Sequence, residues 1–323
     1  MKEAVFFNRN SERWTAFESL LNGPDKDNPD KLADLFIQIT DDLAYARTYY
    51  PKSNVVNYLN NLAYRSHQLI YVNKKENKKR IRFFWSKEYP MLLFGIRRYI
   101  IYSLLILLVS ISVGVLSTLK DDTFVRLILG DSYVNMTLSN IDKGDPLAVY
   151  KSMNEADMFL GITFNNIKVS IIAFLFGIFL SVGTAYIIFE NGLMLGAFLT
   201  FFYQKGLLGS AMSIIWIHGT LEIFAIVVAG AAGLILGNSI LFPGTYNRKT
   251  SFINGVRKSL KIVLGVAPLF IVAGFLEGFI TRYTFMPLTI KLSIILLSLV
   301  FIIWYFFIYP VIIYKNIINH KQK

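Results

Sequence analysis

The sequence predicts an all-α, polytopic membrane protein with about six transmembrane helices and an N-terminal helical domain. Of its 323 residues, 54% are hydrophobic and 15% aromatic, which exceeds the usual composition of a soluble protein of this length. The mean hydropathy is +0.48, and apolar runs long enough to cross a bilayer recur from residue 96 onward. Basic residues flank these runs, so membrane topology explains the net charge of +12.

The composition also excludes several classes of function. Cysteine is absent, which excludes disulfides, thiolate metal sites and a cysteine nucleophile. The sequence contains no Walker loop, no Gly-x-Ser-x-Gly elbow and no dinucleotide fingerprint. A non-enzymatic function is therefore favoured over an enzyme. The positive charge comes without a nucleic-acid-binding motif, so no nucleic-acid partner is predicted.

Residues 1–82 are predicted to form a cytoplasmic helical domain. The first helix, over about residues 11–22, ends at Gly23-Pro24. The second begins at Asn28-Pro29-Asp30 and ends at Tyr49-Tyr50-Pro51, and Ser53 can cap the third. Apolar residues repeat at spacings of three and four, as on one face of a helix. Three short helices bury only a small core, which we expect the membrane domain or a second copy of the chain, in a homo-oligomer, to complete.

A basic cluster and an aromatic segment follow this domain. Residues 83–95 begin with Phe83-Phe84-Trp85 and are predicted to lie at the membrane interface. Basic side chains immediately before them favour contact with anionic lipids, so membrane lipids are predicted partners. The basic residues are Lys74, Lys75, Lys78, Lys79, Arg80 and Arg82.

The transmembrane domain is predicted over residues 96–314, with an external loop at 120–166 in which acidic residues outnumber basic ones. Glu190-Asn191-Gly192 predicts a turn between the second and third spans. From Leu193 the third span runs about eleven residues to Gln204, against about twenty for a full crossing, so it is predicted to be short or broken. The expected spans are 96–119, 167–189, 193–203, 207–242, 262–281 and 288–313.

The distribution of basic residues predicts the orientation. Arg97 and Arg98, the residues after the fourth span, and Lys315 with the rest of the tail at 315–323 all carry positive charge. By the positive-inside rule, both termini are expected in the cytoplasm. The predicted location is therefore the cytoplasmic membrane, which the chain is expected to cross several times.

Two ionisable residues stand four apart within the fourth span, His218 and Glu222. On a helix this spacing places both side chains on one face. Ionisable groups at membrane depth usually face the bundle interior or a wet cavity, and they indicate function. Glu277 in the fifth span can join them. The candidate cluster also includes amides at the ends of the second span: Asn165, Asn166 and Asn191.

Three interpretations of this cluster are open. The side chains can form hydrogen bonds that fix helix packing, or they can relay protons or ions. One histidine and two carboxylates can also bind a divalent metal ion and leave a position for water. His-x-x-x-Glu differs from the His-Glu-x-x-His pattern of zinc proteases. Apart from this candidate metal, no cofactor is predicted.

Small residues follow the ionisable pair along the same span. Ala229, Gly233 and Gly237 are spaced four apart, which lets a neighbouring helix approach closely. We expect this face to pack against other helices.

Several motifs together resemble the stage II sporulation protein M family. The membrane domain contributes Phe164-Asn165-Asn166, Glu190-Asn191-Gly192, His218-Gly219-x-x-Glu222, Ala229-Gly230-Ala231-Ala232-Gly233, Pro243-Gly244 and Glu277-Gly278. The segments 42–47 and 58–62 are similar to the N-terminal region of longer bacterial members. The resemblance covers most of the chain and is strongest from Asn165 to Glu277.

The resemblance implies a membrane scaffold for peptidoglycan-degrading partners, and it implies no catalytic residues. The expected function is therefore a scaffold that recruits envelope protein partners. One alternative is a transporter or flippase that uses His218, Glu222 and Glu277 on an envelope-related substrate. A second alternative is an intramembrane metal-dependent hydrolase. A closed, dry bundle favours the scaffold, and a cavity that reaches the three side chains favours the alternatives.

Overall fold

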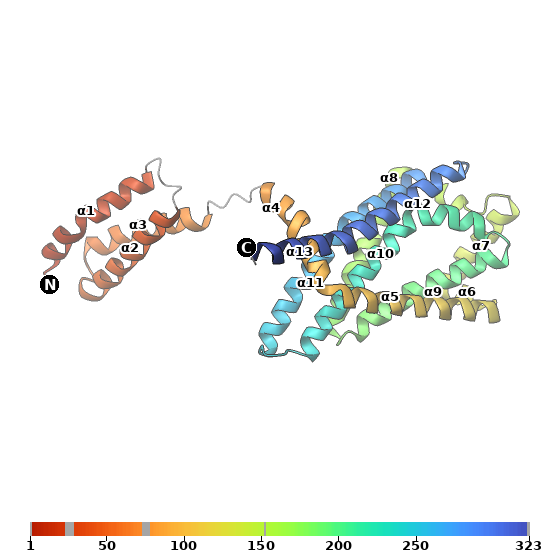
Figure 1. The fold of residues 1–323 in the computed structure, drawn as a ribbon, viewed down its shortest axis with the longest axis horizontal. Coiled ribbons are helices and arrows are strands. Elements are labelled where there is room, and N and C mark those ends of the chain that lie inside the picture. The colour runs from red at the N-terminus through yellow and green to blue at the C-terminus, as the bar shows by residue number, and fades with distance from the viewer. Residues whose placement is uncertain (1, 23–28, 73–77, 152, 322–323) are drawn as a thin grey trace. The chain divides into compact units, whose positions relative to one another are not determined.

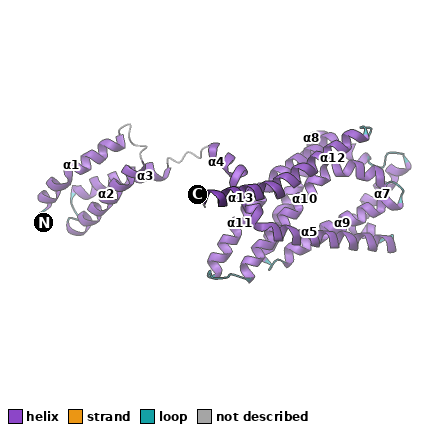
Figure 2. Cartoon of the chain, viewed as in Figure 1, coloured by secondary structure: helices purple, strands orange, loops and turns teal. Residues whose placement is uncertain are grey.

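The structure is a computed structural model that describes residues 2–22, 29–72, 78–151 and 153–321, and the regular elements in these ranges are all helical (Figures 1 and 2). This confirms the predicted all-α class. The chain divides into two compact units, Met1–Arg82 and Phe83–Lys323.

The first unit consists of three helices, α1 (Glu3–Asn22), α2 (Pro29–Tyr49) and α3 (Asn54–Val72). Each turns an apolar stripe inward, as amphipathic helices do. The side chains at the centre are completely buried: Trp14, Phe17, Ile39 and Leu59.

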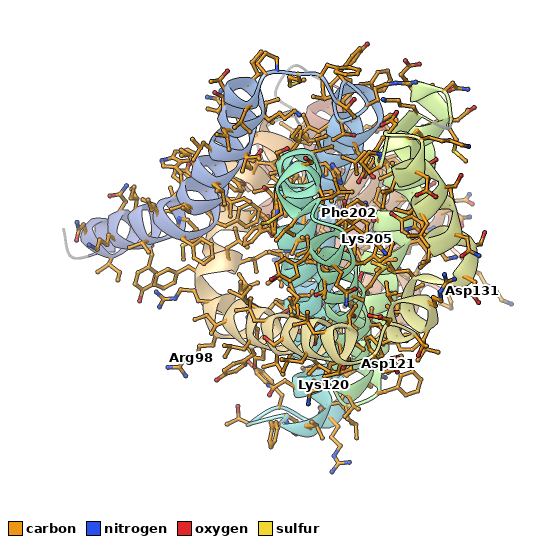
Figure 3. All side chains as sticks on the ribbon, turned by 90° about the vertical axis from the view of Figure 1, so that its right-hand side faces the viewer. Arg98, Lys120, Asp121, Asp131, Phe202 and Lys205 are labelled. Atoms are coloured by element: carbon orange, nitrogen blue, oxygen red, sulfur yellow. The ribbon has the colours of Figure 1, made fainter. Side chains whose placement is uncertain are left out.

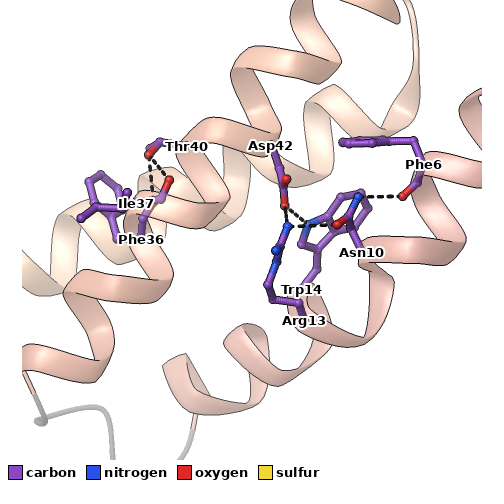
Figure 4. Close-up of polar contacts among 8 residues, drawn as sticks. All are labelled: Phe6, Asn10, Arg13, Trp14, Phe36, Ile37, Thr40 and Asp42. Atoms are coloured by element: carbon purple, nitrogen blue, oxygen red, sulfur yellow. Dashed lines mark hydrogen bonds and ion pairs between the residues drawn. The ribbon is translucent and has the colours of Figure 1, made fainter. Parts of the chain in front are cut away.

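One polar contact crosses the core of this unit (Figure 4). The Trp14 indole Nε1 donates a hydrogen bond of 2.8 Å to Asp42 Oδ2, and Arg13 forms an ion pair with the same carboxylate. A buried indole N–H without an acceptor would destabilise the core. Asp42 therefore ties α1 to α2.

The basic cluster lies partly outside the described residues. Lys74 and Lys75 are outside them, whereas Lys78 and Lys79 begin helix α4 (Lys78–Phe83). The side chains of Arg80 and Arg82 are exposed. Their contact with lipid remains a prediction.

Six helical segments of the described residues are long and apolar enough to cross a membrane. This agrees with the predicted number, and the chain is a multi-pass membrane protein. The segments are α5 (Tyr89–Lys120); α8 (Glu155–Leu175) with η4 (Phe176–Ile178); α9 (Val182–Gln204); α10 (Leu208–Leu241); α11 (Arg248–Phe275) with η5 (Leu276–Ile280); and α12 (Leu288–Ile302) with η6 (Ile303–Ile308) and α13 (Tyr309–Lys321).

Because successive spans alternate in direction, the membrane domain has two distinct ends. We call the end with residues 121–154, 205–207 and 281–287 the acidic end, after the excess of acidic over basic residues in 120–166; it carries α6 (Phe124–Leu129), α7 (Asp131–Asp142) and η3 (Ala148–Lys151). Figure 3 views the chain from this end, with Lys120, Asp121, Asp131 and Lys205 labelled. The opposite end, with residues 179–181 and 242–247, is the basic end.

The turn between the second and third spans is not where the sequence predicted it. The chain reverses at 179–181, where Leu180 and Ser181 have positive φ of 55° and 69°. Glu190-Asn191-Gly192 lies inside α9. A Cβ on Gly192 would lie 2.9 Å from the Leu107 carbonyl oxygen of α5. Gly192 therefore allows α5 and α9 to pack closely. The third span is a continuous helix of 23 residues.

The other corrections concern where helices begin and end. The first span lies on a helical run from Arg80 to Lys120, and Pro90 is tolerated there because it stands in the first turn of α5. Residues 83–95 are thus helical throughout, and their place at the membrane interface remains a prediction. The acidic segment ends before Glu155, because the Asn154 side chain accepts a hydrogen bond from Asp157 N and caps α8. The expected tail at 315–323 is helical to Lys321.

The basic residues after the fourth span also lie on a helix. Residues predicted to lie in a loop belong to α11, which Asn247 caps by accepting a hydrogen bond of 2.8 Å from Thr250 N. These residues are Arg248, Lys249, Arg257, Lys258 and Lys261. They remain near the basic end, in the first turns of that helix.

Helix α10 lies at the centre of the membrane domain (Figure 1) and contacts α5, α8, α9, α11 and α12. Its small residues permit this packing. A Cβ on Gly233 would collide with the Ala173 carbonyl oxygen of α8 and with Thr184 of α9, and one on Gly237 would collide with Ser181. Ala229 is completely buried.

The orientation of the two ends leads to a first prediction. A topology reporter fused at Asp142 and one fused at Thr250 should report opposite sides of the membrane, with Thr250 in the cytoplasm, because basic residues concentrate at its end. Paired phosphatase and fluorescent-protein fusions would measure this. Both sites on one side would contradict the six-span arrangement.

Candidate functional site

The three ionisable side chains of the fourth and fifth spans meet inside the membrane domain. His218, Glu222 and Glu277 each offer a ligand atom, and these atoms all lie within 4.8 Å of one another. His218 Nε2 lies 3.6 Å from Glu277 Oε2, and their side chains are only 6% and 15% exposed. We call these three residues the trio.

The helices explain this meeting. His218 and Glu222 share one face of α10, one turn apart. His218 follows the first residue of α10 by ten positions, or about 15 Å of helix, so the trio lies in the half of the domain nearer the acidic end. Glu277 reaches it from η5, close to the end of the fifth span.

A local departure from α-helical geometry positions Glu277. Residues 276–280 form a π-helical turn, in which Thr281 N donates a hydrogen bond of 2.9 Å to the Leu276 carbonyl oxygen. Single π-turns inside helices often occur at functional sites. A Cβ on Gly278 would lie 3.0 Å from Phe159 N, so glycine lets α8 pack against this turn.

Three cavities reach the trio. The first, of about 370 Å³, is lined by His218, Gly219 and Glu222. The second, of about 430 Å³, is lined by Glu277 and Asp157. The third, of about 600 Å³, is lined by Glu222 and Glu190. The trio is therefore not enclosed in a dry, fully packed bundle.

The first and second cavities lie on the side of the trio nearer the acidic end, and the domain is tightly packed toward the basic end. Residues of α6, α7 and η3 line the first cavity, namely Ile128, Leu129, Tyr133 and Tyr150. Toward the basic end, α10 is buried in a large apolar cluster that includes Val228, Ala232 and Leu236. The third cavity also extends to Tyr186 and Phe189, near the start of α9.

Apart from His218, the linings of the three cavities contain acidic side chains and no basic ones. Their linings contain four carboxylates, Glu222, Glu277, Asp157 and Glu190, and no lysine or arginine. Among the described residues, the ion-pair partner of Glu277 is His218, and neither glutamate of the trio pairs with a lysine or arginine. Such a site attracts cations and repels anions.

His218 retains unused hydrogen-bonding capacity. Its Nδ1 is buried and makes no hydrogen bond within the described part of the chain. The Tyr150 ring packs edge-on against the imidazole, with ring centroids 6.0 Å apart. Aromatic contacts of this kind favour a defined ring orientation, so Tyr150 helps to fix the plane of His218.

The predicted amides lie at different distances from the trio. Asn166 is buried, and its amide interacts with the Glu222 carboxyl group. Asn191 lines the first and third cavities, with its Nδ2 donating to the Ile187 carbonyl oxygen at 2.7 Å. Asn165 is exposed and lines only the outer part of the third cavity.

Two tyrosines at the site were not predicted. Tyr133 and Tyr150 come from the acidic segment and line both the first and second cavities. Burial raises the pKa of Tyr150 well above its ordinary value, and the charge of Glu277 raises it further. The phenol therefore stays protonated and can donate a hydrogen bond. No spacing in the sequence links this loop residue to spans four and five.

Comparison with known proteins decides the family. The model of a family described as stage II sporulation protein M matches residues 103–282, more than half of the chain. The chain belongs to the stage II sporulation protein M family. The matched range contains the trio, the three cavities and the small-residue face of α10.

The first unit matches a different family model. Residues 4–72 match a domain of unknown function, DUF8413. The stage II sporulation protein M match thus covers the membrane domain and leaves the first unit outside it. Neither the search of curated proteins nor the search of solved structures found a match.

Proposed function

We propose that the membrane domain transports a small cation, which enters from the acidic end and binds at the trio. One observation carries this proposal: cavities with an acidic lining and no lysine or arginine reach three buried ionisable side chains. Buried carboxylates are costly unless a cation compensates their charge. A cation is therefore the ligand that this site favours.

Transport explains the arrangement better than packing alone. A purely structural cluster would satisfy its polar atoms internally, because unpaired polar groups destabilise a membrane bundle. The Nδ1 of His218 is instead buried without a hydrogen-bond partner in the described chain. The packed layer between the trio and the basic end is what a transporter presents when it is closed on that side.

Gly219 offers a direct test of this proposal. It lines the first cavity, and a Cβ there would meet its nearest neighbour at 3.7 Å, an ordinary contact. Gly219→Leu should therefore fill the cavity while the domain stays folded. In liposomes containing the full chain, flux of H⁺, K⁺, Mn²⁺ and Zn²⁺ would be followed with ion-sensitive dyes.

We expect wild-type protein to conduct at least one of these cations and Gly219→Leu to reduce its flux at least tenfold. The matched control is Gly95→Leu, because a Cβ on Gly95 in α5 would have no neighbour within 4 Å and this residue lines none of the three cavities. Flux no higher than in empty liposomes, or equal flux in both variants, would contradict the proposal.

A second candidate function is recruitment of envelope proteins. The separate core of the first unit supports it, since this unit can present a surface independently of the membrane domain. The family resemblance also implies a scaffold for peptidoglycan-remodelling partners. Ile37 on α2 is 57% exposed, so a photoreactive probe at this position would face outward from the core of the unit.

Photo-crosslinking in cells tests this second candidate. A photoreactive amino acid at Ile37 should yield a discrete adduct with an envelope protein, and one at the buried Ile39 should not. Absence of an adduct at Ile37, or the same adducts at both positions, would contradict recruitment through this face. Transport would be unaffected by either result.

A further inference from the structure

The trio has the composition of a metal site. Its members are one imidazole and two carboxylates, drawn from two helices and held within 4.8 Å. Zinc and similar divalent ions bind histidine nitrogen and glutamate oxygen at about 2.0–2.2 Å. A tetrahedral ion with such bonds separates its ligand atoms by roughly 3.3–3.5 Å. The 3.6 Å between His218 Nε2 and Glu277 Oε2 already matches this spacing.

A second observation points to a ligand. His218 is 5% exposed, and its Nδ1 has no hydrogen-bond partner within the described residues. Asn166, 6% exposed, is also buried, and its amide interacts with Glu222. Buried polar atoms are normally satisfied, so an unsatisfied imidazole nitrogen next to two carboxyl groups is what a binding site prepared for another group would show.

We propose that His218, Glu222 and Glu277 coordinate a single divalent transition-metal ion. This inference rests on the same site as the proposed transport, and it names the class of cation. The imidazole favours zinc, iron or cobalt over magnesium, calcium and manganese, which suit sites made of oxygen ligands. Three protein ligands leave a coordination position facing the first cavity, where a water molecule can bind.

The surroundings complete the site. Tyr150 packs edge-on against the His218 ring and lines the first cavity beside it. Partners that orient a ligating side chain commonly affect metal affinity by about 10–100-fold. Tyr150 is thus a positioning residue, and the three ligands carry the binding.

Metal binding can be measured without any transport assay. The full chain, purified in detergent and stripped with a chelator, would be titrated with Zn²⁺ by calorimetry, and bound zinc would be counted by elemental analysis after dialysis. We expect one Zn²⁺ per chain in the wild type. Glu277→Gln, which keeps the shape of the side chain, should bind Zn²⁺ at least about 100-fold more weakly, because it removes a ligand.

Cobalt provides an independent readout. Co²⁺ bound by nitrogen and oxygen in a low-coordinate site absorbs visible light, and this spectrum should appear in the wild type and disappear in Glu277→Gln and His218→Ala. The matched control is Asp142→Asn on the exposed end of α7, which should bind Zn²⁺ as the wild type does. Thermal unfolding would show that each variant is folded.

Two results would overturn the metal site: no stoichiometric Zn²⁺ in the wild type, or equal Zn²⁺ binding in the wild type and Glu277→Gln. The inference and the proposed function fail separately. Zinc binding without flux of any cation would overturn transport and leave the metal site standing, as an intramembrane hydrolase requires. Proton or potassium flux without Zn²⁺ binding would overturn the metal site and leave transport standing.

Discussion

Replacing Gly233 with leucine is expected to destabilise the membrane domain by about 3 kcal/mol or more, because a larger side chain in a packed core forces backbone shifts. A Cβ at this position would collide with the Ala173 carbonyl oxygen and with Thr184, while the Cγ2 of Thr184 would lie 2.8 Å away. Backbone cannot rotate out of the way as a flexible side chain can. Thermal unfolding in detergent would measure the change.

The matched control is again Gly95→Leu. The two changes are chemically identical, and both lie on membrane helices. No heavy atom lies within 4 Å of a Cβ at Gly95, so this variant should unfold at or above the wild-type temperature. If both variants were equally stable, the small-residue face of α10 would not be a packed interface.

Replacing His218 or Glu277 with alanine is expected to have the second large effect on the free energy of unfolding. His218→Ala and Glu277→Ala each leave the other partner buried without a counterpart, which costs about 1–3 kcal/mol. Because the two side chains are 3.6 Å apart, the double variant should be less destabilised than the sum. The expected coupling energy is about 0.5–3 kcal/mol, as found for groups in contact.

A pair that shares no contact provides the comparison. Glu277→Ala combined with Asp142→Asn should give additive losses, because Asp142 is exposed on α7 and lines none of the three cavities. Chemical or thermal unfolding of the four proteins in each cycle would measure this. Additive losses for His218 and Glu277 would mean that the two residues do not interact.

Much of the fold could be predicted from the sequence, because membrane helices follow from simple patterns. Apolar length gave the number of spans, and the central helix was expected at 207–242 and found at Leu208–Leu241. The proximity of His218 and Glu222 could be predicted from their spacing alone, since residues four apart share a helix face. Glu277 followed from its place in another span.

The turn at 179–181 could not be predicted, because Leu180 and Ser181 carry no turn signal. Glycine in a membrane protein can either form a turn or allow two helices to pack closely, and the sequence does not distinguish these roles. Gly192 resembles a turn residue after Asn191, yet it serves the close approach of α5. Interpreting it as a turn shortened the third span by eleven positions at its N-terminal end.

The residues of the acidic segment that line the cavities could not be predicted from the sequence either. Tyr133 and Tyr150 lie in the acidic segment, far along the chain from spans four and five, and their burial depends on how that segment folds back onto the bundle. Local patterns carry no information about such contacts. The two tyrosines nonetheless separate the first cavity from the second, and one of them orients His218.

The most direct test of a functional trio is cation flux in liposomes for Glu222→Gln and Glu277→Gln, measured beside the thermal stability of the same proteins. Each change keeps the shape of the side chain and some hydrogen bonding but removes the charge. We expect both variants to unfold within a few degrees of the wild type and to lose at least nine-tenths of its cation flux. Folded variants with undiminished flux would show that the carboxylates only support helix packing and would contradict the account.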